Sequence, residues 1–189
     1  MADYKMIIDG KKVDSAETFP VLNPATEEVV AQCPKASAEH VDQAVAAARR
    51  AFPSWSATPD AERARIVHAI ADALEAHSEE LVQLLTLEQG KPAGGFAGMG
   101  GGFEMGGTLA WAHHTADLEL PIDVIQDNDE ARIEVHRKPL GVVGSITPWN
   151  FPLMIAIWHT MPALRTGNTV VIKPSEYTPL TTLRMAEII

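Results

Sequence analysis

Two stretches near the end of the sequence determine the expected fold: LGVVGSITPWNFP at residues 140–152 and GNTVVIKPSE at residues 167–176. Each contains a short, valine-rich apolar run that predicts a buried strand. The apolar stretch 151–164 between them predicts a helix, and residues 180–189 predict another. A strand, helix, strand and helix joined by short loops predict an α/β fold with parallel strands and a right-handed crossover.

The loops that follow the two predicted strands form the expected ligand site. The strands, residues 141–146 and 169–173, lead into loops 147–150 and 174–179. In parallel sheets, ligands bind beyond the carboxyl ends of the strands. Two strands alone leave two open edges and cannot cover their own faces, so we expect the chain to be the front portion of a larger fold.

Two turns upstream predict β-hairpins. Asp9-Gly10 lies between extended segments 4–8 and 11–13, and Asp-Gly is a strong signal for a two-residue hairpin turn. Residues 127–130 form a charged turn between segments in which apolar and polar side chains alternate. The second turn predicts a hairpin with one face open to solvent or to a partner.

Between these hairpins, apolar residues recur at helical spacing over three segments. Five residues set the expected boundaries: Ser37 caps the first helix, Pro53 ends it, Asp60 caps the second, Ser78 begins the third and Gly90 ends it.

The glycine-rich stretch 94–107 has two interpretations. It contains neither GxGxxG nor GxxxxGK[ST] and follows no predicted strand, which disfavours a phosphate-binding loop. We expect a loop that leads into a glycine-weakened helix. Its expected packing residues are Met99, Phe103, Met105 and Leu109.

Composition narrows the class of protein. The 189 residues carry 15 Lys and Arg against 25 Asp and Glu, a formal charge of −10, which argues against nucleic acid or an anionic membrane as a partner. The apolar content of 46% predicts a folded chain. Because the sequence shows neither a signal peptide nor a long apolar run, we expect a soluble, cytoplasmic protein.

The two late motifs closely resemble the NAD(P)-dependent aldehyde dehydrogenase superfamily. The resemblance extends to DGKKVDSAETFPVLNPATEEVV at 9–30, VDQAVAAARRAF at 41–52 and LTLEQGKP at 85–92. It implies the N-terminal part of a modified Rossmann fold with a protruding β-hairpin, in a family whose chains are more than twice as long. The glycine-rich stretch departs from the family, whose members are more often plainly helical there.

This resemblance also implies an organisation. Residues 1–118 would form the first part of the cofactor-binding domain, 119–139 the oligomerisation hairpin, and 140–189 the beginning of the NAD-binding sheet. The implied activity is oxidation of an aldehyde to a carboxylic acid with NAD, in a homo-oligomer. The family's nucleophilic cysteine and base glutamate belong to motifs beyond residue 189.

Asn150 has two readings. From its place before Phe151-Pro152 it could be a helix N-cap. The resemblance instead matches it to the family's asparagine that stabilises the oxyanion, where one donor typically contributes a factor of about 10²–10³ in rate.

Six further residues are implied to bind the cofactor. Lys173 would donate to the adenosine-ribose hydroxyls and Glu176 would accept from them, which favours NAD over NADP because a carboxylate repels a 2′-phosphate. The residues implied to line the cofactor path are Ile146, Thr147, Pro148 and Trp149. Trp149 could equally be a core residue.

The remaining reactive side chains predict neither a nucleophile nor a metal site. Cys33, the single cysteine, lies far from these motifs, and only Lys35 is a nearby base in sequence. His113 and His114 are adjacent and would diverge on a helix, so no metal site is expected. The alternative to an enzyme portion is a non-catalytic binding or assembly module that uses the hairpin surface.

Overall fold

The computed structural model describes residues 4–94 and 99–189. The helices are α1 (Ala38–Ala57), α2 (Asp60–Ala76), α3 (Ser78–Gln89), α4 (Gly101–Asp117), α5 (Pro152–Arg165) and α6 (Leu180–Ile188). The strands are β1 (Met6–Ile8), β2 (Lys11–Val13), β3 (Thr18–Leu22), β4 (Val29–Pro34), β5 (Asp123–Asp127), β6 (Arg132–Val135), β7 (Val142–Ile146) and β8 (Thr169–Lys173).

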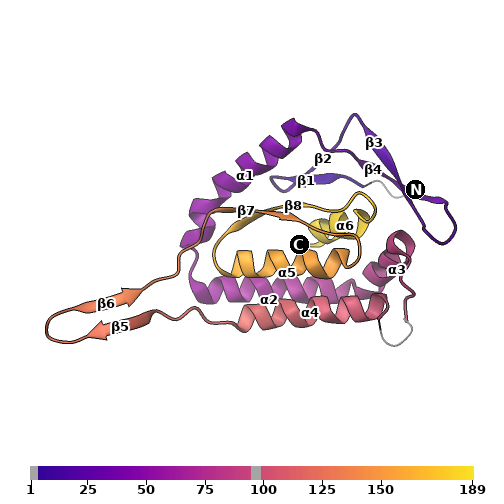
Figure 1. Ribbon diagram of the computed structural model, residues 1–189. Helices are drawn as coiled ribbons and strands as arrows, with labels where there is room; N and C mark the ends of the chain where they lie inside the picture. The colour runs from indigo at the N-terminus through magenta and orange to yellow at the C-terminus, as the bar shows by residue number, and fades with distance from the viewer. Residues whose placement is uncertain (1–3, 95–98) are drawn as a thin grey trace.

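Strands β7 and β8 pair in parallel, as the two late motifs predict. Helix α1 packs on this pair from one side and α5 from the other, while α2 and α4 form a further layer against α5 (Figure 1). The main core joins α2, α3, α4, α5 and α6 through fully buried side chains such as Leu74, Leu85 and Ile157. The α/β prediction is confirmed.

The other strands form antiparallel hairpins. At the turn between β1 and β2, Asp9 and Gly10 both have positive φ angles, 56° and 68°, as a type I′ turn requires. Strands β5 and β6 form a hairpin within residues 119–139 that projects from the body of the molecule (Figure 1). Both predicted hairpins are confirmed.

The predicted helix boundaries are partly correct. Ser37 caps α1 with a reciprocal pair of hydrogen bonds to His40, and Gly90 ends α3 with a φ of 83°. Pro53, however, does not end α1: it lies exposed inside the last turns of the helix. Trp55, in the last turn of α1, donates its indole N–H to the carbonyl of Leu164 at 3.2 Å, a contact that stabilises the helix beyond Pro53.

The prediction that Asp60 caps α2 is also wrong. Pro59 occupies the cap position, and the Asp60 carboxylate instead accepts hydrogen bonds from Arg165, at the end of α5. This guanidinium is 4% exposed and also donates to the carbonyls of Ala116 and Leu118. A buried cation needs a counter-charge, and that demand takes Asp60 away from the cap.

The glycine-rich segment does lead into a helix, α4. Within it, Met105 is buried and Leu109 packs against the core, as expected. Met99 and Phe103 are 61% and 50% exposed, so their predicted packing role is wrong. Part of the stretch considered as a phosphate-binding loop, residues 95–98, lies outside the described residues.

Candidate functional site

The carboxyl ends of β7 and β8 lie side by side. Ile146 is in register with Lys173, and the N–H of Thr147 donates to the Lys173 carbonyl at 3.1 Å. Loops 147–150 and 174–179 therefore leave the same edge of the sheet. The six residues expected around a cofactor all lie at this edge or in these two loops.

Loop 147–150 presents both exposed and buried side chains. Ile146 and Trp149 are 77% and 57% exposed, so Trp149 is not a core residue. Pro148 is half-buried. Thr147 is buried, and its hydroxyl has no hydrogen-bond partner among the described residues. The loop therefore offers apolar surface next to the strand end, with the Thr147 hydroxyl buried beneath it.

Asn150 is exposed and does not cap α5. The cap position is occupied by Phe151, with Pro152 at the first turn of the helix. The backbone carbonyl of Asn150 accepts hydrogen bonds from the ammonium of Lys91 and, at 3.4 Å, from the side-chain amide of Gln89. Among the described residues, its carboxamide makes no hydrogen bond, which leaves its N–H groups open to a ligand.

Two residues behind this loop were missed by sequence reasoning. Glu104 of α4 is fully buried and accepts hydrogen bonds from the backbone N–H groups of Leu153 and Met154, at 3.0 and 3.2 Å. Its other oxygen accepts from Lys91 at 2.7 Å. The signal in the sequence was a carboxylate in the first turn of the helix, within the otherwise apolar, glycine-rich residues 101–112.

Lys173 and Glu176 lie next to each other at the end of β8. The ammonium and a carboxylate oxygen are 3.4 Å apart, and both side chains are 62% exposed. A backbone N–H hydrogen bond and the neighbouring Lys173 lower the pKa of Glu176, so the carboxylate is charged at neutral pH. The pair offers a donor and an acceptor side by side, a combination that suits vicinal hydroxyl groups.

Cys33 is unsuited to nucleophilic attack. It is 3% exposed in β4, and burial, with a smaller contribution from Glu88, raises its pKa to about 12. A nucleophilic cysteine needs a lowered pKa and access to solvent. The chemistry of this thiol agrees with the sequence-based reading.

One surface cluster has metal-ligating chemistry. Asp72 and Glu75 of α2 and His113 of α4 bring one ligand atom each within 4.8 Å of one another. His113 is also 3.0 Å from His68, whose other ring nitrogen contacts Asp117 at 2.9 Å. These positions are substantially exposed, and we assign the cluster no role.

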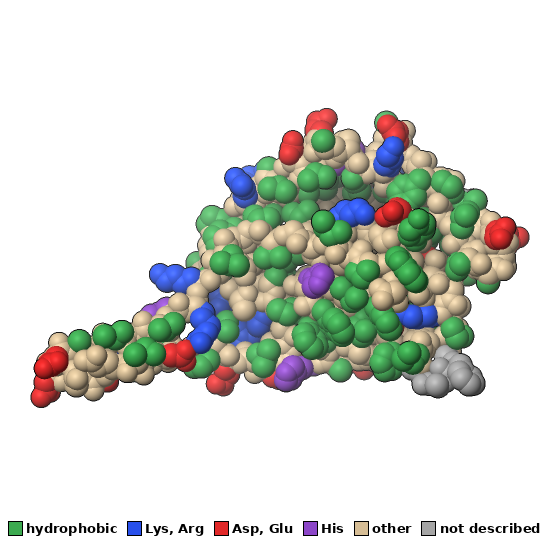
Figure 2. Space-filling model, viewed as in Figure 1, with side chains coloured by type: hydrophobic (Ala, Val, Ile, Leu, Met, Phe, Trp, Pro, Cys, Tyr) green, Lys and Arg blue, Asp and Glu red, His purple; other side chains and the backbone are tan. Residues whose placement is uncertain are grey.

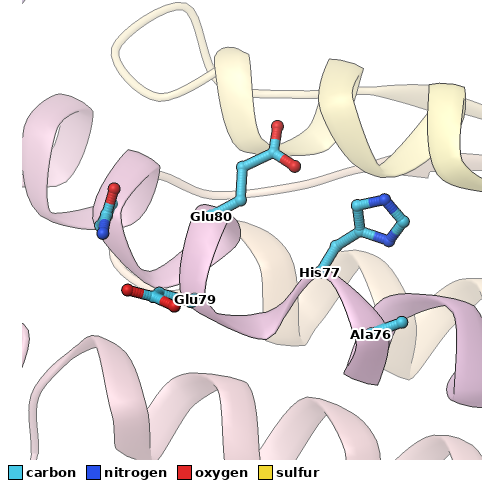
Figure 3. A pocket seen from close by; sticks show the side chains of 5 residues that line it. Ala76, His77, Glu79 and Glu80 are labelled. Atoms are coloured by element: carbon cyan, nitrogen blue, oxygen red, sulfur yellow. The ribbon is translucent and has the colours of Figure 1, made fainter.

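A shallow hollow lies at the junction of α2 and α3, and none of the residues that line it belongs to loops 147–150 and 174–179. It is lined by Ala76, His77, Glu79, Glu80 and Gln83, and Figure 3 shows Glu80 and His77 directed to the same side. Glu80 is paired with Arg184 of α6 at 2.6 Å, and His77 contacts the Ala73 carbonyl at 2.9 Å. Both groups already have structural partners, so the hollow is no rival to the strand-end site.

Hydrophobic side chains gather over α4 and α5 on one face of the molecule (Figure 2). Trp111 and Trp158 contribute to the exposed apolar surface of these helices, at 39% and 40% exposed, with ring centroids 5.4 Å apart. Among the described residues, no helix has the length and apolar character needed to cross a membrane.

Comparison with known proteins gives consistent matches. A model of the aldehyde dehydrogenase family matches residues 11–189. Phenylacetaldehyde dehydrogenase of Pseudomonas fluorescens is 40% identical over 200 residues, which cover 98% of this chain and 38% of that protein. Mitochondrial succinate-semialdehyde dehydrogenase of Arabidopsis thaliana is 41% identical, with 96% of this chain and 34% of that protein covered.

Solved structures agree with these sequence matches. PnpE from Pseudomonas sp. WBC-3 superimposes with a TM-score of 0.91 at 42% identity, over 99% of this chain and 38% of that one. PnpE in complex with nicotinamide adenine dinucleotide gives a TM-score of 0.89, with 98% and 38% covered. The chain thus spans a little over a third of the length of these relatives.

Proposed function

The chain belongs to the aldehyde dehydrogenase family, and on that premise we propose that it is the N-terminal portion of an enzyme that oxidises an aldehyde to a carboxylic acid with NAD. The observation that carries the proposal is the shared edge of β7 and β8. It holds an unpaired amide donor, Asn150, and a donor–acceptor pair, Lys173 and Glu176, on adjacent loops.

Asn150 is the proposed oxyanion-stabilising residue. Its carboxamide N–H groups would donate to the aldehyde oxygen as negative charge grows there during attack by a thiolate. A donor held in place contributes most when the oxygen becomes anionic, so this interaction favours the transition state over the bound aldehyde. The structure supports this reading because Phe151 occupies the cap position and the Asn150 amide has no partner among residues 4–94 and 99–189.

Lys173 and Glu176 are the proposed ribose ligands. When bound, NAD supplies the hydride acceptor for the oxidation. The ammonium would donate to the ribose hydroxyls and the carboxylate would accept from them, while Ile146, Thr147, Pro148 and Trp149 would line the path of the cofactor. In support, the donor and the acceptor lie 3.4 Å apart and both side chains are exposed.

The remaining catalytic groups would lie in a part of the enzyme that corresponds to the roughly two thirds of the relatives that this chain does not cover. We place the nucleophilic cysteine and the base glutamate there, because Cys33 is buried with a raised pKa. The unpaired edges of the β7–β8 sheet and the apolar surface on α4 and α5 would be covered by the same additional residues. A cytoplasmic location remains a prediction.

The β5–β6 hairpin is the proposed oligomerisation element. Its exposed apolar residues are Val124, Ile125, Ile133 and Val135, and it projects from the body of the molecule (Figure 1). A surface of this kind is better explained by a second subunit than by solvent. Replacing Ile125 and Ile133 with Ser should lower the native mass of the assembly, while an unchanged mass would count against this role.

The principal test is an aldehyde oxidation assay on the full-length protein, with aromatic, aliphatic and carboxylate-bearing aldehydes. We expect one NADH to form for each molecule of carboxylic acid, and a native subunit mass far above the 20.4 kDa of these 189 residues. A folded protein that oxidises none of these aldehydes with NAD or NADP would overturn the proposal. A native subunit of 189 residues would favour the non-catalytic module instead.

A separate test addresses the cofactor. Glu176→Gln removes the charge that would repel a 2′-phosphate and should shift the ratio of the kcat/KM values for NAD and NADP towards NADP. Glu17→Gln is a suitable control, because Glu17 is an exposed glutamate paired with Lys35 away from this edge. An unchanged ratio of kcat/KM values for the two cofactors in Glu176→Gln would remove Glu176 from the site.

A further inference from the structure

A buried ion pair lies directly behind the loop that carries Asn150. The Glu104 side chain is 0% exposed and the Lys91 side chain 12% exposed, with their charged atoms 2.7 Å apart. Burying two charges is unfavourable unless each makes further hydrogen bonds. The further contacts of these two side chains therefore show what the pair holds in place. They are made with residues 150–154.

Glu104 caps the helix that begins after Asn150. The first turn of α5 receives no hydrogen bond from the side chain of its own cap residue, Phe151. One oxygen of Glu104 accepts instead from the N–H groups of Leu153 and Met154. A carboxylate is favoured at a helix N-terminus. Because Glu104 belongs to α4, its hydrogen bonds fix the beginning of α5 against α4, directly after loop 147–150.

Lys91 holds the peptide of Asn150 itself. Its ammonium donates to the Asn150 carbonyl and lies 3.5 Å from the centroid of the Phe151 ring. Gln89 adds a second donor to the same carbonyl. The Lys91 ammonium thus contacts Asn150 and Phe151 directly. It also binds Glu104, which in turn binds the first turn of α5.

A glycine in α4 allows this close approach. A Cβ atom at Gly107 would lie 2.7 Å from the sulfur of Met154, the residue whose N–H Glu104 binds. With hydrogen at that position, the Met154 side chain lies directly against α4 without having to move. This contact gives part of the glycine-rich stretch a structural reason without any phosphate ligand.

We propose that Lys91 and Glu104 are positioning residues that hold Asn150 where its amide can stabilise an oxyanion. The inference rests on the proposed role of Asn150. The Asn150 side chain is exposed and makes no hydrogen bond within the part of the chain that the structure describes, so its direction depends on the peptide that Lys91 and Glu104 fix. A displacement of about 1 Å at such a donor can lower the rate by about 10²-fold.

The test uses the full-length enzyme and three variants. Lys91→Met keeps the aliphatic stem and removes the ammonium; Glu104→Gln keeps an acceptor for the α5 N–H groups and removes the charge. Lys91→Arg retains a cation that can donate to both Glu104 and the Asn150 carbonyl. Lys35→Met is the matched control, since it breaks an exposed lysine–glutamate pair remote from the loop.

We expect Lys91→Met and Glu104→Gln to lower kcat per folded molecule by about 10–100-fold while KM for NAD stays within about twofold. Lys91→Arg should recover part of the loss and Lys35→Met should cause none. In an Asn150→Ala background, Lys91→Met should lower kcat little further, because both changes act on one interaction. A merely structural role would give additive losses or a lower melting temperature with normal kcat.

Failure of this inference differs from failure of the proposed function. If Asn150→Ala lowers kcat and Lys91→Met and Glu104→Gln do not, the positioning role is wrong and the role of Asn150 stands. If Asn150→Ala itself leaves kcat unchanged, the proposed function of Asn150 fails first. Should Lys91→Met not fold, the Glu104→Gln variant and its combination with Asn150→Ala decide in its place.

Discussion

The buried carboxyl group of Glu88 should make the stability of the protein depend on pH. Glu88, 2% exposed in α3, accepts hydrogen bonds from the backbone N–H groups of Leu180 and Thr181, at 2.6 and 2.9 Å, and from the Thr181 hydroxyl. Burial raises its pKa to about 7 from 4.5, against these hydrogen bonds, which lower it. The charged carboxylate is therefore disfavoured in the folded state.

The sign of the effect follows from the raised pKa. The stabilising contribution is fully present below pH 4.5, the unfolded value, and is lost as the pH rises through about 7. This interval corresponds to about 3 kcal/mol of unfolding free energy. Glu88→Gln keeps an acceptor oxygen and cannot ionise, so its stability relative to the natural protein should rise by about this amount across the interval.

Urea unfolding of both proteins, measured between about pH 5 and about pH 8, tests the prediction. Glu80→Gln on the same helix is the control, because Arg184 lowers the pKa of exposed Glu80 and its contribution changes only below 4.5. A stability difference for Glu88→Gln that is independent of pH, or that falls as the pH rises, would refute the reasoning. Such a result would mean that the three hydrogen-bond donors and the N-terminus of α6 lower the pKa of Glu88 by more than burial raises it.

Three further predictions concern stability and reactivity. Arg165→Met should lower the free energy of unfolding measured in urea by about 1–3 kcal/mol, because it leaves the Ala116 and Leu118 carbonyls without their buried donor and removes one of the two arginines that bind Asp60. Arg65→Met, at an exposed pair with Glu62, should have a much smaller effect, and equal effects would contradict this account. Gly90→Ala should lower the melting temperature, because the φ of Gly90 is +83° and a Cβ would lie 2.7 Å from Pro24. Gly106→Ala should raise it, because Gly106 lies in a helix with open space around the added methyl group. A Gly90→Ala variant as stable as the natural protein would be inconsistent with this geometry. Cys33 should react with iodoacetamide only after unfolding, as followed by mass spectrometry in increasing urea, and rapid alkylation of the native protein would show that it is not the buried thiol described here.

Local signals in the sequence predicted most of the fold. Asp9-Gly10, the Ser37 cap and the glycine at position 90 act through their own neighbours, and each does so in the structure. The β7–α5–β8 unit followed from two apolar strands and a short loop at each end. These features need no knowledge of distant residues.

Features set by distant contacts were missed. Pro53 remains inside α1 because Trp55 is anchored to Leu164, far away in the sequence. The Asp60 carboxylate binds Arg165 instead of capping α2, because a buried guanidinium without a counter-charge costs more free energy than an uncapped helix. The sequence pattern around each residue supports the local interpretation, and only the contacts that Trp55 and Asp60 make with the end of α5 reverse it.

The candidate site divides in the same way. Asn150, Lys173 and Glu176 follow strand ends, so topology alone places them at one edge. Lys91 and Glu104 come from a helix end and an apolar helix, and their contact with residues 150–154 arises only when α3, α4 and α5 pack together. Charged residues in apolar, glycine-rich segments are the sequence feature that could have indicated them.

The most direct test of the central claim is the turnover of Asn150→Ala in the full-length enzyme. With active sites counted and NAD binding measured on the same sample, the account predicts that kcat for aldehyde oxidation falls by about two orders of magnitude while NAD affinity is retained. Since Phe151 rather than Asn150 caps α5, the variant should also keep its melting temperature. A folded Asn150→Ala enzyme that binds NAD and turns over at the natural rate would contradict the account.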